Sequence, residues 1–500
     1  MRLLNSSCIL LLLLCLGLVS CIEARAQPVD TRPNIVVFLC DDLGYGDLAC
    51  YGHPYIRTPH LDQLAGEGIR FTDFYSAAPV CSPSRVGLLT GRNPNRGGVY
   101  DWIPPSDGTA RPNAREQVHM RSSEITIPRL LQGAGYATLL AGKWHCNSRF
   151  NEPDVQPLPS DFGFDHWLAT NNNAQPSHNN PSNFIRNGVS IGEISEFSCQ
   201  YVVTEAIEWL RELRATNRHA NSERGGDQPF FLFIPFHEPH EPVASPQTLV
   251  ELYENVASSE DEAQYFANVT NIDVAVGRML QALADMQLTD NTLVIFTSDN
   301  GPETLNRYRT ANRSFGRPGE LRGMKLHTHE AGVRVAGIVR WPAQIAAGQT
   351  VSTPVSSLDL LPTFCQLAGC QLPQRNLDGQ DILPVWKGQA ITRDKPLVWC
   401  YYNAINEARM AMRDGDWKVL ARLDGGEVPK MQNVTPQLYQ QLQSVSLTDV
   451  EIYDLSSDRS ESNNLASARH ELATEMLAKL QQQFNDLLYD SPTWEPTTDE

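Results

Sequence analysis

The chain has 500 residues, of which 41% are hydrophobic and 20% are charged, and its formal net charge is −18. This composition is typical of a globular protein with enough length for one large domain and one smaller domain. The strong negative charge argues against a nucleic-acid partner, because a polyanion would be repelled.

The first 26 residues have the pattern of an export signal. Arg2 precedes an apolar run over residues 8–19, and Ala24-Arg25-Ala26 offers a cleavage site. Residues 18–21 also resemble a lipobox, in which Cys21 would be lipidated and anchor the protein; we favour cleavage after Ala26. The apolar run is too short for a membrane span. We therefore expect a periplasmic or extracellular protein with no transmembrane segment after signal removal.

Four apolar segments predict buried parallel strands, and polar side chains follow each of them. The segments are 34–40, followed by Asp41 and Asp42; 136–141, followed by Lys143 and His145; 229–236, followed by His237; and 292–297, followed by Asp299 and Asn300. Lys143 and His145 are two apart in a segment that we expect to be extended, so both should point the same way. A parallel sheet brings such strand ends to one edge, which predicts a single site.

The remaining pattern predicts helices on both sides of this sheet and a second, smaller sheet. Helices are predicted over 58–68, 127–134, 199–213, 261–288 and 359–368, with a further strand at 337–342. After Pro396, short strand patterns at 397–402, 409–413, 417–422 and 451–455 precede a helix at 471–488. We expect an α/β catalytic domain over residues 27–390, with a large mixed, mostly parallel sheet flanked by helices. A C-terminal α+β subdomain over 391–500 should contain a small antiparallel sheet and a helix.

A short helix is predicted at Cys81-Ser-Pro-Ser-Arg-Val-Gly-Leu-Leu-Thr-Gly-Arg92. Ser82 and Pro83 are a typical helix start, and Gly91 is a typical stop. Cys81 would then lie at the helix N-terminus, where free N–H groups favour an anion, and Arg85 would return to the same face one turn later. A reactive side chain and a fixed cation therefore converge.

This motif, C-x-P-x-R followed by an apolar run and T-G-R, resembles the signature of the type I, formylglycine-dependent sulfatases. The surrounding sequence is most similar to the arylsulfatase and N-acetylgalactosamine-sulfatase branch. The resemblance implies an alkaline-phosphatase-like fold and conversion of Cys81 to formylglycine by a maturation enzyme. It implies one divalent cation, calcium rather than magnesium, bound by Asp41, Asp42, Cys81, Asp299 and Asn300. It further implies that Arg85 stabilises position 81, that Lys143 and Lys325 bind sulfate, that His145 helps to break down the sulfated intermediate, and that His237 lies near the leaving oxygen.

Two polar loops are candidates for substrate selection. Residues 96–123 contain Asp101 and Trp102, and residues 170–181 contain His178, with Arg186 after them. With His240, these are possible sugar contacts; ordinary solvated loops are the alternative.

The expected reaction is hydrolysis of sulfate esters on galactose or N-acetylgalactosamine units of a glycan. A formylglycine-dependent phosphonate monoester or phosphodiester hydrolase would use nearly the same residues and remains an alternative. A catalytically silent protein that binds sulfated glycans is another. After Lys325 the sequence reads Leu-His-Thr-His-Glu-Ala, which differs from the glycine-rich sequence that is commoner in the sulfatases and leaves the shape of that loop open.

Overall fold

The computed structural model describes residues 32–105, 114–220, 228–305 and 307–495. The predicted export signal, with Cys21 and Ala26, lies outside the described residues. Within the described part of the chain, no helix is both long enough and apolar enough to cross a bilayer.

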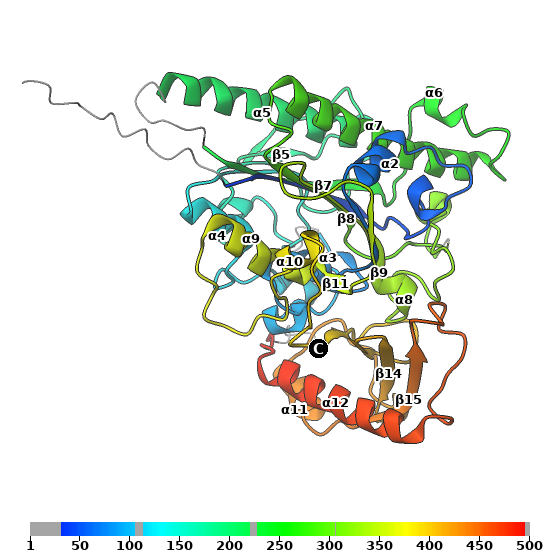
Figure 1. The fold of residues 1–500 in the computed structure, drawn as a ribbon. Helices are drawn as coiled ribbons and strands as arrows, with labels where there is room; N and C mark the ends of the chain where they lie inside the picture. Colours follow the sequence, from blue (N-terminus) through cyan, green and yellow to red (C-terminus); the bar gives the residue numbers. More distant parts are fainter. Residues whose placement is uncertain (1–31, 106–113, 221–227, 306, 496–500) are drawn as a thin grey trace, which may run out of the picture.

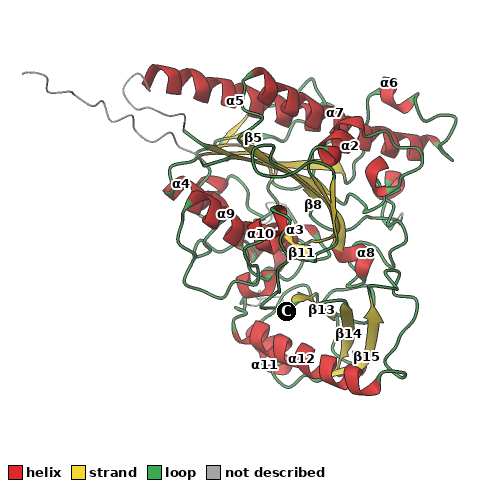
Figure 2. Ribbon diagram, viewed as in Figure 1, coloured by secondary structure: helices red, strands yellow, loops and turns green. Residues whose placement is uncertain are grey.

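An eleven-stranded mixed sheet forms the centre of the catalytic part (Figures 1 and 2). Its order is β10-β2-β9-β8-β1-β7-β3-β4-β5-β6, with β11 beside β2. The strands are β1 (Asn34–Asp41), β2 (Ile69–Tyr75), β3 (Ala137–Lys143), β4 (His166–Thr170), β5 (Ile185–Arg186), β6 (Val189–Ser190), β7 (Phe230–Pro239), β8 (Thr292–Ser298), β9 (Arg334–Arg340), β10 (Gln349–Val351) and β11 (Val355–Ser356). The central strands β8, β1, β7, β3 and β4 are parallel, whereas β9 runs antiparallel to β8 and β2. The predicted mixed, mostly parallel sheet is confirmed.

Helices cover both faces of this sheet (Figure 1). They are α2 (Pro59–Gly66), α3 (Cys81–Thr90), α4 (Ile127–Gly133), α5 (Ser198–Ala220), α6 (Gln247–Val250), α7 (Glu260–Asp285), α8 (Glu330–Val333), α9 (Leu360–Ala368) and α10 (Leu383–Trp386). Successive side chains of β1 enter opposite cores: Val36 and Phe38 pack with α2, α5 and α7, while Ile35 and Val37 pack with α3, α4 and α9. Burial on both faces explains why β1 is apolar throughout.

The C-terminal part is a four-stranded antiparallel sheet, as predicted. Its strands β12 (Leu397–Cys400), β13 (Met410–Asp414), β14 (Trp417–Leu423) and β15 (Leu447–Asp454) pair in that order, and α11 (Pro436–Leu442) and α12 (His470–Tyr489) accompany them. Met412 and Val419 pack against α12 on one face, whereas Trp399 and Leu420 pack against Tyr75 of the large sheet on the other. The small sheet is therefore sandwiched between α12 and the catalytic part.

Several predicted boundaries were wrong, and β2, β4, β5, β6, β10 and β11 were not predicted. In β2 the apolar and polar residues alternate over only Ile69 to Thr72, and the strand then buries Asp73, which pairs with Arg413 at 2.6 Å. Strand β7 continues three residues beyond the predicted end at Phe236. Because of that extension, the first histidine after the strand is His240 and not His237.

Candidate active site

Strands β8, β1, β7 and β3 are neighbours, and their carboxyl ends bring the predicted polar residues together. The Asp42 N–H donates to Asp299 Oδ1 at 3.3 Å, and Asn300 Nδ2 donates to Asp42 Oδ1 at 2.7 Å. Asp41 is also fully buried here. The four predicted oxygen ligands thus form one cluster.

Two buried cations compensate for two of these acids. Lys143 Nζ donates to Asp41. Arg85 Nε donates to Asp299 Oδ2 at 2.8 Å, and Arg85 Nη2 lies 2.8 Å from the same oxygen as an ion pair. Arg85 Nη1 also donates to the Lys143 carbonyl oxygen at 2.8 Å, so the guanidinium ties α3 to the end of β3. Although burial opposes it, Lys143 holds the pKa of Asp41 well below its usual range.

The remaining negative charge is poorly compensated. Lys325 Nζ donates to Asp42 at 2.6 Å, yet burial raises the pKa of Asp42, and the charge on Asp41 adds to this effect. Burial, again with Asp41, raises the pKa of Asp299 to about 7. Oδ1 of Asp41 and Oδ1 of Asn300 are buried and have no hydrogen-bond partner among the described residues. Crowded carboxylates and unpartnered oxygens are the donors that a hard divalent cation needs, so these residues fit one.

Cys81 begins α3, one residue before the predicted start, and only 2% of its surface is exposed. Gly91 ends the helix with φ 65°, in the left-handed region that favours glycine. Ligand atoms of Asp41, Asp42, Cys81 and His240 all lie within 4.8 Å of one another. Burial, followed by the charge of Asp41, raises the pKa of the Cys81 thiol.

A cavity of about 600 Å³ opens onto Cys81. Its other lining residues are Val80, Trp102, Pro105, His145, Asn171, Asn172, Asn173, Gln175, Asn183, His240, Glu241, Arg307, Tyr308, Lys325 and Leu326. Cys81 and Lys325 are both nearly buried within it. The cavity can therefore hold an anionic ester against the reactive position, with its organic part toward the polar side chains.

The structure places His240, and not His237, in this cavity. Because β7 extends to Pro239, His237 remains inside the strand, where it is 1% exposed and its Nε2 lies 2.8 Å from Thr170 Oγ1. His240 is the first residue beyond the strand, and its Nε2 lies 3.6 Å from Asp42 Oδ2. The role expected of His237 near the leaving oxygen therefore fits the position of His240.

His145 reaches the cavity by a different route from the one predicted. Its φ of 53° shows that the chain is no longer extended after Lys143, so the expected strand alternation does not apply. His145 Nε2 lies 2.9 Å from the Ile103 carbonyl oxygen, which can only accept, so Nε2 carries the hydrogen. Nδ1 has no partner among the described residues and is left with its lone pair.

Of the predicted sugar contacts, Trp102 and His240 line the cavity and the other three do not. Asp101 is buried behind the wall, where it accepts hydrogen bonds from Tyr401 at 2.7 Å and from Asn403 at 3.0 Å. Its contacts connect the loop that carries Trp102 to the C-terminal subdomain.

His178 and Arg186 lie outside the cavity, which corrects their expected role. His178 is 0% exposed, and its Nδ1 lies 3.1 Å from Asn268 Nδ2. Arg186, in β5, donates to Glu205 of α5 at 2.6 and 2.8 Å. Both side chains make structural contacts because their loop folds back over α5 and α7.

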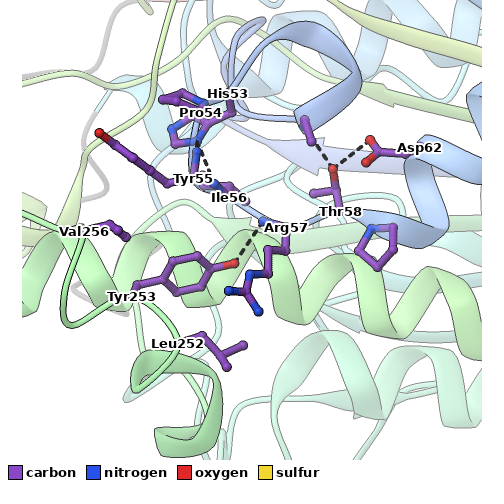
Figure 3. A pocket seen from close by; sticks show the side chains of 12 residues that line it. His53, Pro54, Tyr55, Ile56, Arg57, Thr58, Asp62, Leu252, Tyr253 and Val256 are labelled. Carbon is purple, nitrogen blue, oxygen red and sulfur yellow. Dashed lines mark hydrogen bonds between the residues drawn. The ribbon is translucent and has the colours of Figure 1, made fainter.

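A second cavity, of about 560 Å³, lies between the loop after β1 and the α6–α7 region (Figure 3). Polar groups in its lining bond to one another: the Arg57 N–H donates to the Tyr253 hydroxyl at 3.0 Å, and the Thr58 hydroxyl donates to Asp62 at 3.0 Å. Among the described residues that line this cavity, there is no unpartnered acid and no cysteine.

Sequence reasoning missed several residues of the first cavity. The asparagines at 171–173 fell within the predicted substrate loop but were not singled out, and Glu241, Arg307 and Tyr308 were overlooked. Glu241 could have been found from its position, since it directly follows the candidate His240. The asparagines follow β4, a strand that was not predicted, and no sequence pattern singled out Arg307 or Tyr308.

Comparisons with known proteins agree with this geometry. The family model described as sulfatase matches residues 33–370, and the model described as N-sulphoglucosamine sulphohydrolase, C-terminal, matches residues 324–489. Human arylsulfatase A is 36% identical over 477 residues, covering 92% of this chain and 88% of the relative. N-acetylgalactosamine-6-sulfatase of Canis lupus familiaris is 34% identical over 393 residues, covering 77% and 71%.

The solved structures show the same architecture. The structure described as Ps i-CgsB in complex with k-i-k-neocarrahexaose matches with a TM-score of 0.72 and 26% identity, covering 94% of this chain and 96% of that one. The family models, the curated relatives and the buried cluster around Cys81 agree. The chain belongs to the sulfatase family and is a sulfuric ester hydrolase.

Proposed function

We propose that this sulfatase removes sulfate from galactose or N-acetylgalactosamine units of a glycan, with formylglycine at position 81 and one divalent cation. The observation that carries the proposal is the convergence of Cys81, Asp41, Asp42 and His240 within 4.8 Å at the cavity that Lys325 also lines. Formylglycine would supply a hydrated aldehyde, whose hydroxyl is a nucleophile that an unmodified cysteine cannot provide.

Asp41, Asp42, Asp299 and Asn300 would hold the cation. When bound, it would supply positive charge for the ester oxygens and for an alkoxide at position 81. We propose calcium, because the donors are carboxylate and amide oxygens, which suit a hard cation of variable geometry. The unpartnered Oδ1 atoms of Asp41 and Asn300 support this assignment.

Lys143 and Lys325 would bind sulfate oxygens in exchange for part of their contact with Asp41 and Asp42, which a cation would then neutralise. His240 would protonate the departing sugar oxygen, since it lies at the rim of the cluster and lines the cavity. His145 would take a proton from position 81, because its Nδ1 carries the free lone pair. Arg85 would keep Asp299 and the end of β3 in place through its hydrogen bonds to Asp299 and to the Lys143 carbonyl oxygen.

The family supports a sulfated saccharide and a formylglycine-generating enzyme as partners. Among the curated relatives, an N-acetylgalactosamine-6-sulfatase is 34% identical, which supports a galactose-type sugar. Export to the periplasm or the extracellular space, with Cys21 as an alternative lipid anchor, is proposed from the sequence of the leader alone.

The test is release of inorganic sulfate from a panel of sulfated galactose and N-acetylgalactosamine saccharides. Enzyme produced with a formylglycine-generating partner is compared with its Cys81→Ala variant, and conversion of Cys81 is verified by mass spectrometry. Release by the converted enzyme alone supports the proposal, and loss of this activity on calcium chelation supports the cation. Hydrolysis of phosphonate monoesters or phosphodiesters without sulfate release would contradict the proposal and indicate a phosphonate monoester or phosphodiester hydrolase.

His240→Ala and His237→Ala form a matched pair for the proposed proton donor. General acid catalysis contributes about 10²- to 10⁴-fold. We expect kcat to fall by that order in His240→Ala, and the loss to shrink for an activated aryl sulfate, whose leaving group needs no proton. The reverse order of effects in the two variants would restore the role to His237.

A further inference from the structure

Three buried oxygens on the cavity lining accept no hydrogen bond from the described residues. They are Oδ1 of Asn171, Oδ1 of Asn172 and Oε2 of Glu241. Asn171 Nδ2 donates to the Ser148 carbonyl oxygen at 2.6 Å, which fixes its other atom as the acceptor. A buried acceptor without a partner lowers stability, so such atoms are expected where a ligand completes them.

Glu241 is the most unusual of the three, because it is a carboxylate with 5% of its surface exposed. Its Oε2 lies 3.2 Å from His240 Nδ1, but that nitrogen hydrogen-bonds to the Glu241 carbonyl oxygen at 3.0 Å. The two cations of the cavity are engaged elsewhere: Lys325 pairs with Asp42 at 2.6 Å, and Arg307 Nε donates to Glu303 at 3.0 Å. The Tyr308 hydroxyl hydrogen-bonds to the Glu241 carboxylate, but among the described residues this carboxylate has no lysine or arginine partner.

The chemistry of these groups selects the kind of molecule that can fill the cavity. Carboxylate and amide oxygens require donors, and the free hydroxyl groups of a sugar supply several on one ring. A carboxylate or a second sulfate at the same place would meet the charge of Glu241 in a poorly hydrated site, where repulsion is strong. Trp102, Pro105 and Leu326 add apolar surface to the same cavity, which suits the C–H face of a sugar.

We propose that Glu241 is a specificity-determining residue that accepts a hydroxyl of the sulfated sugar and excludes sugars with a second negative charge. The occupant of this part of the cavity is therefore a monosulfated, otherwise neutral sugar. The inference rests on the proposed function, since it needs sulfate esters as substrates, and it narrows that function to one charge class.

The experiment compares kcat/KM for three substrates: a methyl glycoside of galactose monosulfate, the same glycoside with a second sulfate, and an aryl sulfate without sugar hydroxyls. The enzymes are the converted wild type, Glu241→Gln, and Glu251→Gln as a control at an exposed glutamate outside the cavity. The wild type should prefer the monosulfate over the disulfate at least tenfold. In Glu241→Gln this ratio should shrink about tenfold, and kcat/KM for the monosulfate should fall more than for the aryl sulfate, whereas Glu251→Gln should keep the wild-type ratio.

An unchanged ratio in Glu241→Gln would overturn the inference. An equal loss on all three substrates would also overturn it, because Glu241 would then act through His240 and not on the sugar. Asn172→Ala provides a second test if Glu241→Gln does not fold: it should lower kcat/KM for the monosulfate more than for the aryl sulfate. Failure of the converted wild type to release sulfate from any substrate would instead refute the proposed function.

Discussion

Lys418 offers a sharp test of how the two sheets are held together. It lies in β14 with 0% of its side chain exposed, and its Nζ is 2.8 Å from Glu330 Oε1 and 3.0 Å from Glu461 Oε1, both carboxylates being 0% exposed as well. Removing one partner of a buried ion pair typically costs about 3–5 kcal/mol. Glu330 keeps a second cation, Arg334, at 2.5 Å, so we expect Lys418→Met to lower the free energy of unfolding by about 3 kcal/mol at pH 7.

The loss should grow with pH because of Glu461. Burial raises the pKa of Glu461 to about 7 even with Lys418 beside it. Without Lys418 this pKa rises further, so above pH 7 the folded variant retains a proton that the folded wild type releases. Each pH unit above 7 then adds up to about 1.4 kcal/mol, which gives a loss of about 5 kcal/mol at pH 8.5.

Urea unfolding at pH 7 and pH 8.5, followed by tryptophan fluorescence, measures both effects. Lys479→Met is the matched control, since Lys479 Nζ is 3.4 Å from Asp414 but 47% of its side chain is exposed. Such a surface pair contributes about 0–1 kcal/mol. Equal losses in the two variants, or a Lys418→Met loss that does not depend on pH, would refute the reasoning.

Three further predictions follow from single contacts. A Cβ at Gly142, which has φ 136°, would lie 1.9 Å from the Pro235 carbonyl oxygen. We therefore expect Gly142→Ala to displace Lys143 and to lower kcat/KM for sulfate release about 10²-fold or more. The control Gly133→Ala should retain activity, because a Cβ at Gly133 would have nothing within 4 Å. Burial, followed by the charge of Lys418, lowers the pKa of His329 to about 2, so below about pH 6.5 the unfolded chain binds a proton that the folded state does not. The free energy of unfolding should therefore fall by up to about 3 kcal/mol by pH 4.5. In urea titrations His329→Gln should reduce this pH dependence, and an unchanged pH dependence would contradict the assignment. Tyr401→Phe removes the 2.7 Å hydrogen bond to Asp101 and should lower the free energy of unfolding by about 1–3 kcal/mol in thermal unfolding. It should also raise KM, because Asp101 precedes Trp102 in the cavity wall. An unchanged KM would show that the Tyr401–Asp101 contact does not position Trp102 for substrate binding.

The strands of the large sheet were predictable where both faces are buried. Segments such as 292–297 are continuously apolar, and this pattern holds whatever the strand's neighbours are. Strand β2 escaped prediction because it buries Asp73, whose partner Arg413 comes from the distant small sheet at 2.6 Å. Local pattern carries no information about a partner 340 residues away.

The charged part of the site was predictable because strand ends of a parallel sheet converge. The structure places His240, three residues after the predicted His237, at the cavity, because β7 continues to Pro239, which pairs with Asp41 across the sheet. His178 and Arg186 failed for a related reason. Arg186 pairs with Glu205 of α5, and His178 lies beside Asn268 of α7, and no sequence pattern predicts which way a polar loop folds.

The position of β1 has a consequence for the order of events during synthesis. This apolar strand spans Asn34–Asp41, but its two neighbours, β7 and β8, end only at Pro239 and Ser298. At roughly 5–20 residues per second, the ribosome needs about 13–50 s to produce the missing partners, and the nascent chain cannot close its sheet before then. Counted from Cys81 to the end of β8, the same rate gives about 11–43 s, during which Cys81, only 2% exposed once the fold is complete, cannot yet be buried by the closed sheet. Any enzyme that modifies Cys81 therefore has tens of seconds to act before the side chain is buried in the fold.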